Sequence, residues 1–428
     1  MPQPPSAVSR DEPVIRDRGD ACPGALRLHA ADDGFLARVR IPGGLLDVPQ
    51  ATALGLAADR FGDGHLELTS RGNVQLRGLA DGCGAELAHL LDTAGLLPAP
   101  THERVRNIVA SPLSGMDGGG RPHVLPWVRS LDRLLCAGPR AAALSGRFLF
   151  AVDDGRGDVA ALGPDVTLLG LPRDRALVRL GAAADAVEVA APDAPRAALL
   201  AAVYFLDAAD AAGTRPWRVS ELPAEHTLQA AELTVRLTAA GIAVRTVPEV
   251  RWPYSPPPRP AGPAGSGLCV LPPLGRLTSA QWHALVDAAE AADGELRVTP
   301  WRGIVLPGAL GPGSAGHHRL EDAGLAVTPD GPWESVTACT GRPGCAKALS
   351  DVRADARALV HEARGPLPLH WSGCERRCGH PRAAAWVDLV ATPGGYLLDG
   401  RPVAPHQLAA AVSEARRRPR VSEDAVKK

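Results

Sequence analysis

Alternating apolar and polar residues mark the first strands of the chain. Residues Phe35–Gly44 alternate and end in a Gly-Gly turn, and a helix is expected at about Pro49–Arg60. Residues His65–Leu79 alternate again on both sides of a turn at 71–73, and a second helix is expected from about Gly84 to Ala94. This order of elements predicts half of a ferredoxin-like α+β unit.

The same pattern returns in the second half of the chain. Residues Leu268–Gly308 read as strand, helix and strand. The Arg-Gly pair at 71–72 aligns with the pair at 302–303, an offset of 231 residues. Downstream, residues 107–111 align with 335–339 at an offset of 228. Coincidence between short strand patterns is the alternative, but two blocks in the same order at nearly one offset favour a two-copy internal repeat.

Stretches rich in Pro, Gly or charge separate these blocks. Both ends of the chain predict disordered tails, and the Pro/Gly-rich residues Arg251–Gly267 predict a linker between the copies. The expected boundaries are a tail at 1–20, a ferredoxin-like half at 21–104, an α/β domain at 105–250, the linker at 251–267, a second ferredoxin-like half at 268–332, a second α/β domain at 333–415 and a tail at 416–428.

Composition points to a cytoplasmic protein. The 46 basic and 47 acidic residues leave a net charge of −1, which gives no general attraction to nucleic acid or to a membrane surface. No apolar run approaches the length of a membrane span, and the N-terminal residues lack the apolar core of a secretion signal. Eight cysteines without such a signal are typical of a reducing compartment.

Half of the cysteines fall within one short stretch. They are Cys339, Cys345, Cys374 and Cys378. Five and three residues separate the members of the two pairs, and 28 residues lie between the pairs. Two close pairs can converge on one metal centre, and four thiolates suit a [4Fe–4S] cluster. Zinc is an alternative, although its paired cysteines are usually only about two to four residues apart. A disulfide framework fits less well, because a chain of this length can build its own core.

The segment between the two pairs predicts a helix from Ala346 to Arg364, ended by Gly365 and Pro366. Cys345 would then lie at the helix N-terminus, where free N–H groups favour a thiolate. The remaining cysteines are isolated and are expected to be plain thiols: Cys22, Cys83, Cys136 and Cys269.

The pattern C-x5-C followed by G-C-x3-C resembles the signature of the sirohaem-type nitrite and sulfite reductase superfamily. The resemblance implies that the four cysteines hold a [4Fe–4S] cluster and that Cys378 is placed to bridge it to a sirohaem iron. It also implies an α+β fold with a pseudo-twofold repeat, in which two ferredoxin-like halves join in one domain and two α/β domains follow them.

Arginines lie at the ends of several predicted strands, at Arg40, Arg71, Arg106 and Arg147. The guanidinium fork binds carboxylates bidentately and keeps its charge, so several around one cavity would suit a polycarboxylate ligand. The alternative is that they are solvated residues at strand ends.

The family resemblance favours the first interpretation. In the superfamily the motifs R-x-R-x-P-G-G, T-x-R-x3-Q and R-N-[VI] bind tetrapyrrole carboxylates. The residues of this chain that match those motifs are Arg40, Arg71 with Gln75, and Arg106 with Asn107.

Two segments resemble the precorrin-3B synthase branch of the superfamily, which serves aerobic cobalamin biosynthesis. The oxyanion-binding K-F-K segment of the reductases corresponds to Arg147–Leu149, where leucine replaces the second lysine. The following stretch contains DDGRGD at Asp153–Asp158 and reads as strand, tight turn and strand. Residues Tyr204–Pro223 also resemble that branch.

This resemblance implies a monooxygenase that hydroxylates precorrin-3A at C20 with O2 and closes a γ-lactone. A non-haem iron is implied in place of sirohaem, and its ligands are unknown. His370 and His380 flank the cysteine segment and are candidates, against the commoner explanation of exposed loop histidines. No other catalytic residue is assigned.

Electrons should come from an external donor, a ferredoxin or an NAD(P)H reductase, because no G-x-G-x-x-G motif follows a strand and opens a helix. Two alternatives remain at this point: a sirohaem-dependent nitrite or sulfite reductase, and a zinc- or cluster-stabilised binding protein.

Overall fold

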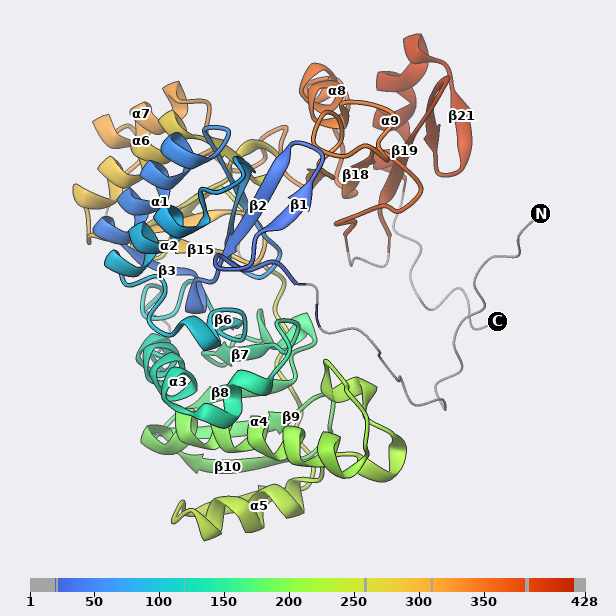
Figure 1. Cartoon of the computed structure of the whole chain (residues 1–428). Coiled ribbons are helices and arrows are strands. Elements are labelled where there is room, and N and C mark those ends of the chain that lie inside the picture. The colour runs from blue at the N-terminus through green and yellow to red at the C-terminus, as the bar shows by residue number, and fades with distance from the viewer. Residues whose placement is uncertain are drawn as a thin grey trace.

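The computed structural model describes residues 20, 22–118, 120–257, 260–308, 311–381 and 385–418. Within these ranges the strands form four sheets (Figure 1). Two sheets lie in a central domain built by both halves of the chain, and each of the others belongs to an α/β domain. The tail expected at residues 1–20 lies outside the described residues, apart from Asp20.

The first sheet of the central domain is completed by a strand from the second half of the chain. In spatial order it contains β1 (His29–Ala31), β2 (Gly34–Val39), β5 (Val74–Leu79), β4 (His65–Leu68) and β14 (Arg276–Thr278). The helices of this half are α1 (Val48–Phe61) and α2 (Gly84–Thr93). Their positions agree with the sequence prediction to within one residue.

The second sheet mirrors the first. It contains β12 (Gly262–Ala264), β13 (Gly267–Val270), β16 (Ile304–Pro307), β15 (Glu295–Val298) and β3 (Leu45–Asp47), with helices α6 (Ser279–Glu290) and α7 (Ala315–Asp322). Strand β3 therefore crosses into the second sheet and β14 into the first, each pairing antiparallel with its new neighbour. This exchange joins the two ferredoxin-like halves into one domain, as the predicted fold class requires.

Both exchanged strands lead directly into a capped helix. Asp47 and Gln50 form a reciprocal capping box at the start of α1, and Thr278 and Gln281 form the same box at the start of α6. Such a box satisfies N–H groups that the first helical turn leaves unpaired. The same sequence device thus ends the exchanged strand and begins the helix in both copies.

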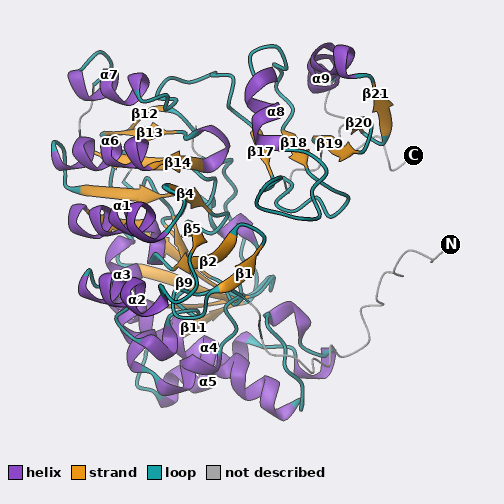
Figure 2. Cartoon of the chain, turned by 45° about the horizontal axis from the view of Figure 1, so that its top comes forward, coloured by secondary structure: helices purple, strands orange, loops and turns teal. Residues whose placement is uncertain are grey.

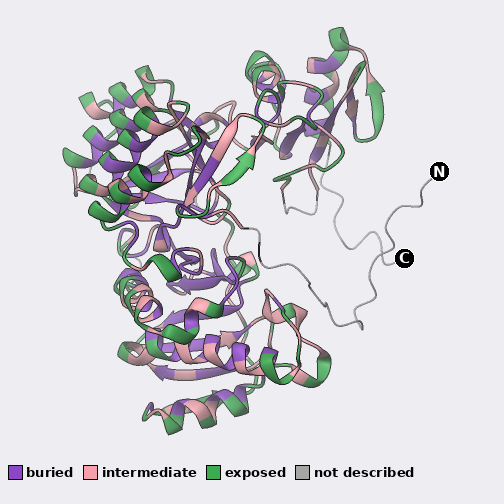
Figure 3. Cartoon of the chain, viewed as in Figure 1, coloured by how far each residue is buried: buried purple, intermediate pink, exposed green. Residues whose placement is uncertain are grey.

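The helices of the central domain cover one face of its sheets (Figure 2). Helices α1 and α6 pack together, and the indole of the buried Trp282 donates a hydrogen bond to the carbonyl of Ala51 (2.7 Å). Since side chains alternate along a strand, residues such as Val39 and Leu76 face this apolar layer, while Arg38 turns to the other face. The strands are largely buried and the outer helix faces are exposed (Figure 3).

The first α/β domain has a mixed sheet. In chain order its strands are β6 (Ile108–Ala110), β7 (Phe150–Asp153), β8 (Val166–Leu171), β9 (Arg175–Leu180), β10 (Ala186–Ala190) and β11 (Val244–Val247), and its helices are α3 (Leu125–Ala137), α4 (Ala194–Ala211) and α5 (Ala230–Ala239). The pairs β6–β7 and β7–β8 are parallel, and the later pairs are antiparallel.

The second α/β domain repeats this plan. Its elements are β17 (Val336–Ala338), α8 (Val352–Leu359), β18 (Leu369–Ser372), β19 (Val387–Thr392), β20 (Gly395–Leu398), β21 (Arg401–Val403) and α9 (Leu408–Arg417). Here two parallel pairs are followed by two antiparallel pairs, one antiparallel pair fewer than in the first α/β domain. The domain stands beside β1 and β2 of the central domain (Figures 1 and 2).

The repeat is present, but its register at the first block differs from the expected one. The turn between β4 and β5 closes with a hydrogen bond from Thr69 N to Asn73 O, and the turn between β15 and β16 closes from Thr299 N to Gly303 O. The offset is therefore 230 residues, and the counterpart of Gly72 is Arg302. The expected pairing of Arg-Gly with Arg-Gly was wrong by one residue. It aligned the two copies on their shared dipeptide, whereas the hydrogen bonds of the two turns align them one residue apart.

Three local predictions also need correction. The helix expected at 346–364 is shorter, since α8 starts only at Val352, where Asp351 caps it by accepting from Ala354 N (3.1 Å). Cys345 consequently lies in a turn. The DDGRGD segment leads into a 3-10 turn at Ala160–Leu162 where a strand was expected. The linker expected at 251–267 ends in the short strand β12.

The C-terminal tail begins later than residue 416. Helix α9 runs through Arg417, and Arg416 is only 2% exposed. Its guanidinium donates to the carbonyls of Leu367 (2.9 Å) and Ala363 (2.7 Å), which anchors the helix to the domain. Among the described residues, no helix is both long enough and apolar enough to cross a membrane.

Candidate functional site

The cysteine segment lies where two parallel strands end. Cys339 directly follows β17, and Gly373 and Cys374 directly follow β18. Because parallel neighbours end at the same sheet edge, these residues meet, and Gly373 N donates to Cys339 Sγ (3.1 Å). The pKa of the Cys339 thiol is raised, first by burial and further by the nearby Cys378 and Cys374. Three of the four predicted cysteines are thus brought to one edge.

The turn that carries Cys345 is anchored on the central domain. Arg77 of β5 donates to the carbonyl of Gly344 (2.8 Å), and the backbone N–H of Ala346 donates to the carboxylate of Asp32 in the turn between β1 and β2 (2.6 Å). These bonds hold the cysteine turn against the first sheet.

The thiols as placed do not form a closed zinc site. Four thiolates about 2.3 Å from one zinc ion would lie about 3.8 Å apart. In the described chain, no three of the cysteine sulfurs lie within 4.8 Å of one another. A cubane binds each thiolate at a separate iron corner, so it does not require the sulfurs to meet at one ion.

A polar cavity of about 680 Å³ opens beside the cysteines. It is bounded by the first ferredoxin-like half, the first α/β domain, the second half and the cysteine segment. Of the predicted residues, those lining it are Arg40, Arg71, Gln75, Asn107, Arg147, Cys339 and Cys378. The fold therefore brings the expected ligand-binding residues other than Arg106, and two expected cluster ligands, into one space.

Arg40 and Arg71 have no carboxylate partner among the described residues. Arg40 is 3% exposed and donates from Nε to the carbonyl of Arg104 (3.3 Å), whereas Arg71 donates to the carbonyl of Gly146 (3.2 Å). Burial lowers the pKa of each to about 10, helped by the like charges of Arg38 and Arg218 respectively. Two charged groups without a counter-ion favour an anionic ligand.

The two predicted amides hold the arginines in position. The amide oxygen of Gln75 accepts from Arg38 (2.9 Å), and its NH2 group donates to Glu67 (3.2 Å). Asn107 is 1% exposed and donates to the carbonyls of Gly146 and Phe148. It therefore fixes the loop that carries Arg147.

Arg106 does not belong to the cavity, contrary to the prediction. Its guanidinium forms a bidentate pair with Asp132 (2.7 and 2.8 Å) and donates to the carbonyl of Leu96 (2.8 Å). Although burial opposes the charge, the bonds to Asp132 raise the pKa of Arg106. A cation already paired in this way ties the loop before β6 to α3.

Arg147 and Leu149, which correspond to the two lysines of the reductases, lie in different environments. Arg147 lines the cavity, and its guanidinium stacks on the Trp217 ring at 4.5 Å. Leu149 is 3% exposed and packs in an apolar cluster with Val109 and Ala151. The side chain at that position therefore offers no charge to a ligand, while the Leu149 backbone N–H donates to Asp165 (2.8 Å), the partner of Arg218.

Sequence reasoning missed several cavity residues. They include Arg38, Glu67, Arg218, Arg302 and Arg353, together with Cys22, which had been expected to be a plain thiol. Strand alternation places Arg38 on the same face as Arg40, so the first arginine of the R-x-R motif was open to detection. Arg353 lies on α8 and pairs with Glu67 (2.6 Å), a contact between domains that local patterns do not reveal.

The two histidine candidates show no ligand set. His370 lies in β18 and is fully buried, so it is not a loop residue; its Nδ1 hydrogen-bonds with the Thr337 hydroxyl (2.8 Å). Burial, and next the charge of Arg302, lower the pKa of His370 to about 3. His380 is exposed and stacks on Trp386, with ring centroids 5.4 Å apart.

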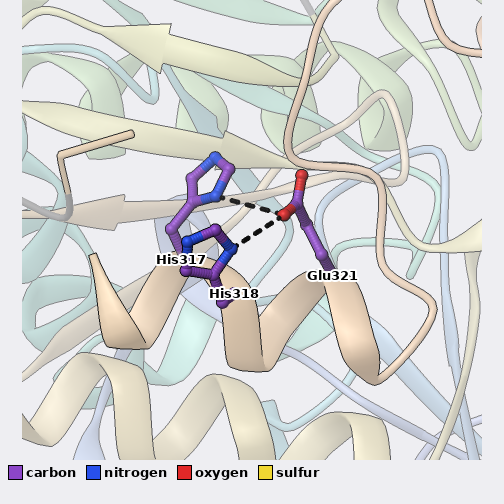
Figure 4. A group of neighbouring side chains, drawn as sticks. All are labelled: His317, His318 and Glu321. Atoms are coloured by element: carbon purple, nitrogen blue, oxygen red, sulfur yellow. Dashed lines mark hydrogen bonds and ion pairs between the residues drawn. The ribbon is translucent and has the colours of Figure 1, made fainter. Parts of the chain in front are cut away.

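Another histidine group lies on the helical layer. His317, His318 and Glu321 of α7 point toward one another, and the Glu321 carboxylate lies 3.6 and 3.4 Å from the two Nδ1 atoms (Figure 4). These residue types suit a divalent metal ion. Helix α7 packs on α6, on the face of the sheets opposite the cavity, so this group is not part of the candidate site.

Comparisons with known proteins agree with this architecture. Residues 28–91 and 261–310 match the family profile of the nitrite/sulfite reductase ferredoxin-like half domain. A precorrin-3B synthase of Sinorhizobium sp is 26% identical over 406 residues, which cover 90% of this chain and 83% of that protein. The ferredoxin–nitrite reductase of Synechococcus elongatus is 27% identical over 388 residues, covering 82% of this chain and 75% of that protein.

Among solved structures, the NirA protein of Mycobacterium tuberculosis superposes with a TM-score of 0.66 at 20% identity, covering 85% of this chain and 73% of that chain. The matched half domains coincide with the two sheets that exchange β3 and β14. The chain thus carries both ferredoxin-like half domains of the nitrite/sulfite reductase family profile, and over most of its length it is similar to a precorrin-3B synthase and to ferredoxin–nitrite reductases.

Proposed function

We propose that this protein is a precorrin-3B synthase, an O2-dependent monooxygenase of aerobic cobalamin biosynthesis. Its substrate would be precorrin-3A, hydroxylated at C20 with closure of a γ-lactone by the neighbouring acetate. The cavity carries this proposal, because buried arginines without carboxylate partners border the cysteine segment. A polycarboxylate macrocycle matches both the charge and the multiple anchoring points.

The roles of the residues follow from their positions. Arg40 and Arg71 would each bind a substrate carboxylate, and Arg147 would add a third cation from the rim, where it stacks on Trp217. Gln75 would orient the neighbouring Arg38, and Asn107 would fix the loop that carries Arg147, through the hydrogen bonds described above. Fixing several carboxylates at once holds the ring in one orientation, so that one carbon of the macrocycle is presented for reaction.

The four cysteines would hold a [4Fe–4S] cluster, and such a cluster, when bound, supplies electrons one at a time. The cavity position of Cys339 and Cys378 would put these electrons next to the substrate. Inserting one oxygen atom of O2 leaves the other to be released as water, which consumes reducing equivalents and protons. These would come from an external donor, a ferredoxin or an NAD(P)H reductase. The resemblance also implies a non-haem iron, but among the described residues the histidines near the cavity do not form a ligand set for it.

A sirohaem-dependent nitrite or sulfite reductase is the second candidate. It is favoured by the nitrite reductases among the relatives, and the same cavity arginines would suit sirohaem. The apolar surroundings of Leu149 argue against it, because the position that corresponds to the second lysine of the reductases carries no charge.

Two measurements separate these functions. The visible spectrum of anaerobically purified protein should show the broad shoulder of a cluster without the sharp bands of sirohaem. Supplied with precorrin-3A, O2 and an electron donor, the protein should form precorrin-3B, whereas reduced protein should leave nitrite and sulfite unconsumed. Sirohaem bands together with nitrite turnover would refute the proposal.

A further inference from the structure

Arg302 occupies a backbone position that the first copy of the repeat gives to glycine. Its N–H donates to the carbonyl of Thr299 (3.1 Å), as the N–H of Gly72 donates to that of Thr69 (3.2 Å). Both residues are left-handed, with φ of 61° for Arg302 and 66° for Gly72. The two turns thus share the same hydrogen bond and the same left-handed backbone, but only the second turn has a side chain at this position.

That conformation is unfavourable for any residue with a Cβ atom. Strained positions of this kind persist where the surrounding structure enforces them, and they concentrate at ligand sites. In Gly72 the same backbone carries no such cost. The second copy therefore keeps an arginine where glycine would stabilise the fold, which indicates that the side chain has a use.

The Arg302 side chain runs between two glycines toward the cysteine segment. A Cβ atom on Gly275 would lie 2.8 Å from the Cβ and Cδ atoms of Arg302. A Cβ atom on Gly379 would lie 3.0 Å from its Nη2 atom. The guanidinium thus lies beside Gly379, next to Cys378, and all three residues line the cavity.

The charge of Arg302 is not compensated. No hydrogen bond or ion pair to its guanidinium is present within the part of the chain that the structure describes. The cavity carboxylate of Glu67 already accepts from Arg353 (2.6 Å) and from Gln75 (3.2 Å). Burial lowers the pKa of Arg302, as expected for a cation removed from water without a close partner.

We propose that Arg302 binds a carboxylate of the tetrapyrrole at the end of the cavity next to the cysteine segment. This inference rests on the proposed function and assigns a binding residue to the second copy of the repeat, whereas Arg40 and Arg71 belong to the first. Substrate would then be held from both halves of the central domain, with its edge fixed beside Cys378.

The test compares full-length, cluster-reconstituted wild type with Arg302→Gly, Arg302→Lys and Arg60→Ala. The probe is uroporphyrin, a tetrapyrrole bearing acetate and propionate groups, titrated by fluorescence, and the melting temperature of each protein is measured without ligand. Arg302→Gly should bind uroporphyrin about 10- to 100-fold more weakly, as expected for loss of a charged hydrogen-bonding group. The same variant should melt at a higher temperature than wild type, because glycine relieves the strain.

Arg302→Lys should keep the melting temperature of wild type and lose part of the affinity, since a point charge does not reproduce the fork. Arg60 is exposed on α1 and paired with Glu86, so Arg60→Ala should change neither quantity. Unchanged affinity in Arg302→Gly, or a lower melting temperature, would overturn the inference while leaving the proposed function intact. Wild-type protein that does not bind uroporphyrin would count against both.

Discussion

Two buried arginines of the cavity carry a charge that no carboxylate among the described residues neutralises. Among the described residues, the side chains of Arg40 and Arg71 donate only to backbone carbonyls, whereas Arg106, in an equally suggestive motif, is neutralised by Asp132. Sequence motifs selected all three, because a motif reports residue type and local spacing. The acid that pairs with Arg106 is Asp132 of α3, 26 residues further along the sequence, so local spacing could not reveal the pair.

The first prediction concerns the guanidinium fork. Arg40→Lys and Arg71→Lys should each weaken uroporphyrin binding by about 1–3 kcal/mol, because lysine cannot form the bidentate contact. Arg106→Lys is the matched control: it should lower the melting temperature through loss of the Asp132 pair while the folded protein binds as wild type does. Titration of the three variants checks this, and a loss confined to Arg106→Lys would reverse the assignment.

The second prediction is a pH dependence. Both arginines have a folded pKa of about 10, well below the ordinary value for arginine, so they remain charged at neutral pH and lose a proton as pH rises through about 10. Binding of carboxylates should therefore be nearly constant between about pH 7 and pH 9 and should weaken above about pH 10. Because the unfolded chain holds these protons up to higher pH, the contribution of these two groups to folding stability should rise as pH increases above about 10.

Titration in buffers of equal ionic strength separates this effect from screening. Affinity that is flat up to pH 11 in wild type, with folding intact by circular dichroism, would mean that Arg40 and Arg71 do not carry the binding.

At the scale of elements, the parallel pair β17–β18 is what gathers the cysteines. The sequence revealed the two cysteine pairs, but it placed Cys345 on a helix that is too long. Apolar periodicity continues upstream of α8 through Ala348 and Leu349, while the backbone there turns, with Ala348 N donating to Cys345 O (2.9 Å). Contacts of this turn with Arg77 and Asp32 override the local helical preference, and such long-range contacts leave no local signature.

The third prediction follows from this arrangement. Replacing any of the four cysteines with serine, Cys345 included, should reduce bound iron and acid-labile sulfide, because a cubane loses a corner ligand. Cys83→Ser is the control, since this thiol lies at the start of α2 in the central domain. Iron and sulfide analysis after anaerobic reconstitution decides the matter. A full complement in Cys345→Ser would exclude Cys345 from the ligand set.

For the molecule as a whole, the exchange of β3 and β14 explains why one cavity can draw on every domain. The two-copy repeat was readable from similar strand–helix–strand blocks, and the fold class followed from it. The exchange of strands could not be read from the sequence, because pairing of β3 with β15 joins residues about 250 positions apart, as in Leu46 with Leu296. Sheet register over such a separation is decided by the assembled core.

The fourth prediction tests the exchange. Gly44 precedes β3 with φ of 73°, and a Cβ atom there would lie 1.9 Å from the carbonyl oxygen of Val298. Gly44→Ala should cost about 3 kcal/mol, combining the left-handed strain with the clash. Gly82→Ala is the matched control, with φ of 84° and open space around it, and should cost only about 1 kcal/mol. Chemical denaturation measures both, and equal losses would argue against close packing at the exchanged strand.

The most direct test of the proposed function is isotopic. Reduced, cluster-loaded protein is given precorrin-3A and an electron donor under 18O2, and the product is analysed by mass spectrometry. The account predicts a hydroxylated γ-lactone carrying a single labelled oxygen atom, with no consumption of sulfite or nitrite by the same preparation. An unlabelled product, or rapid reduction of either oxyanion, would contradict it and identify the protein as a sirohaem-type reductase.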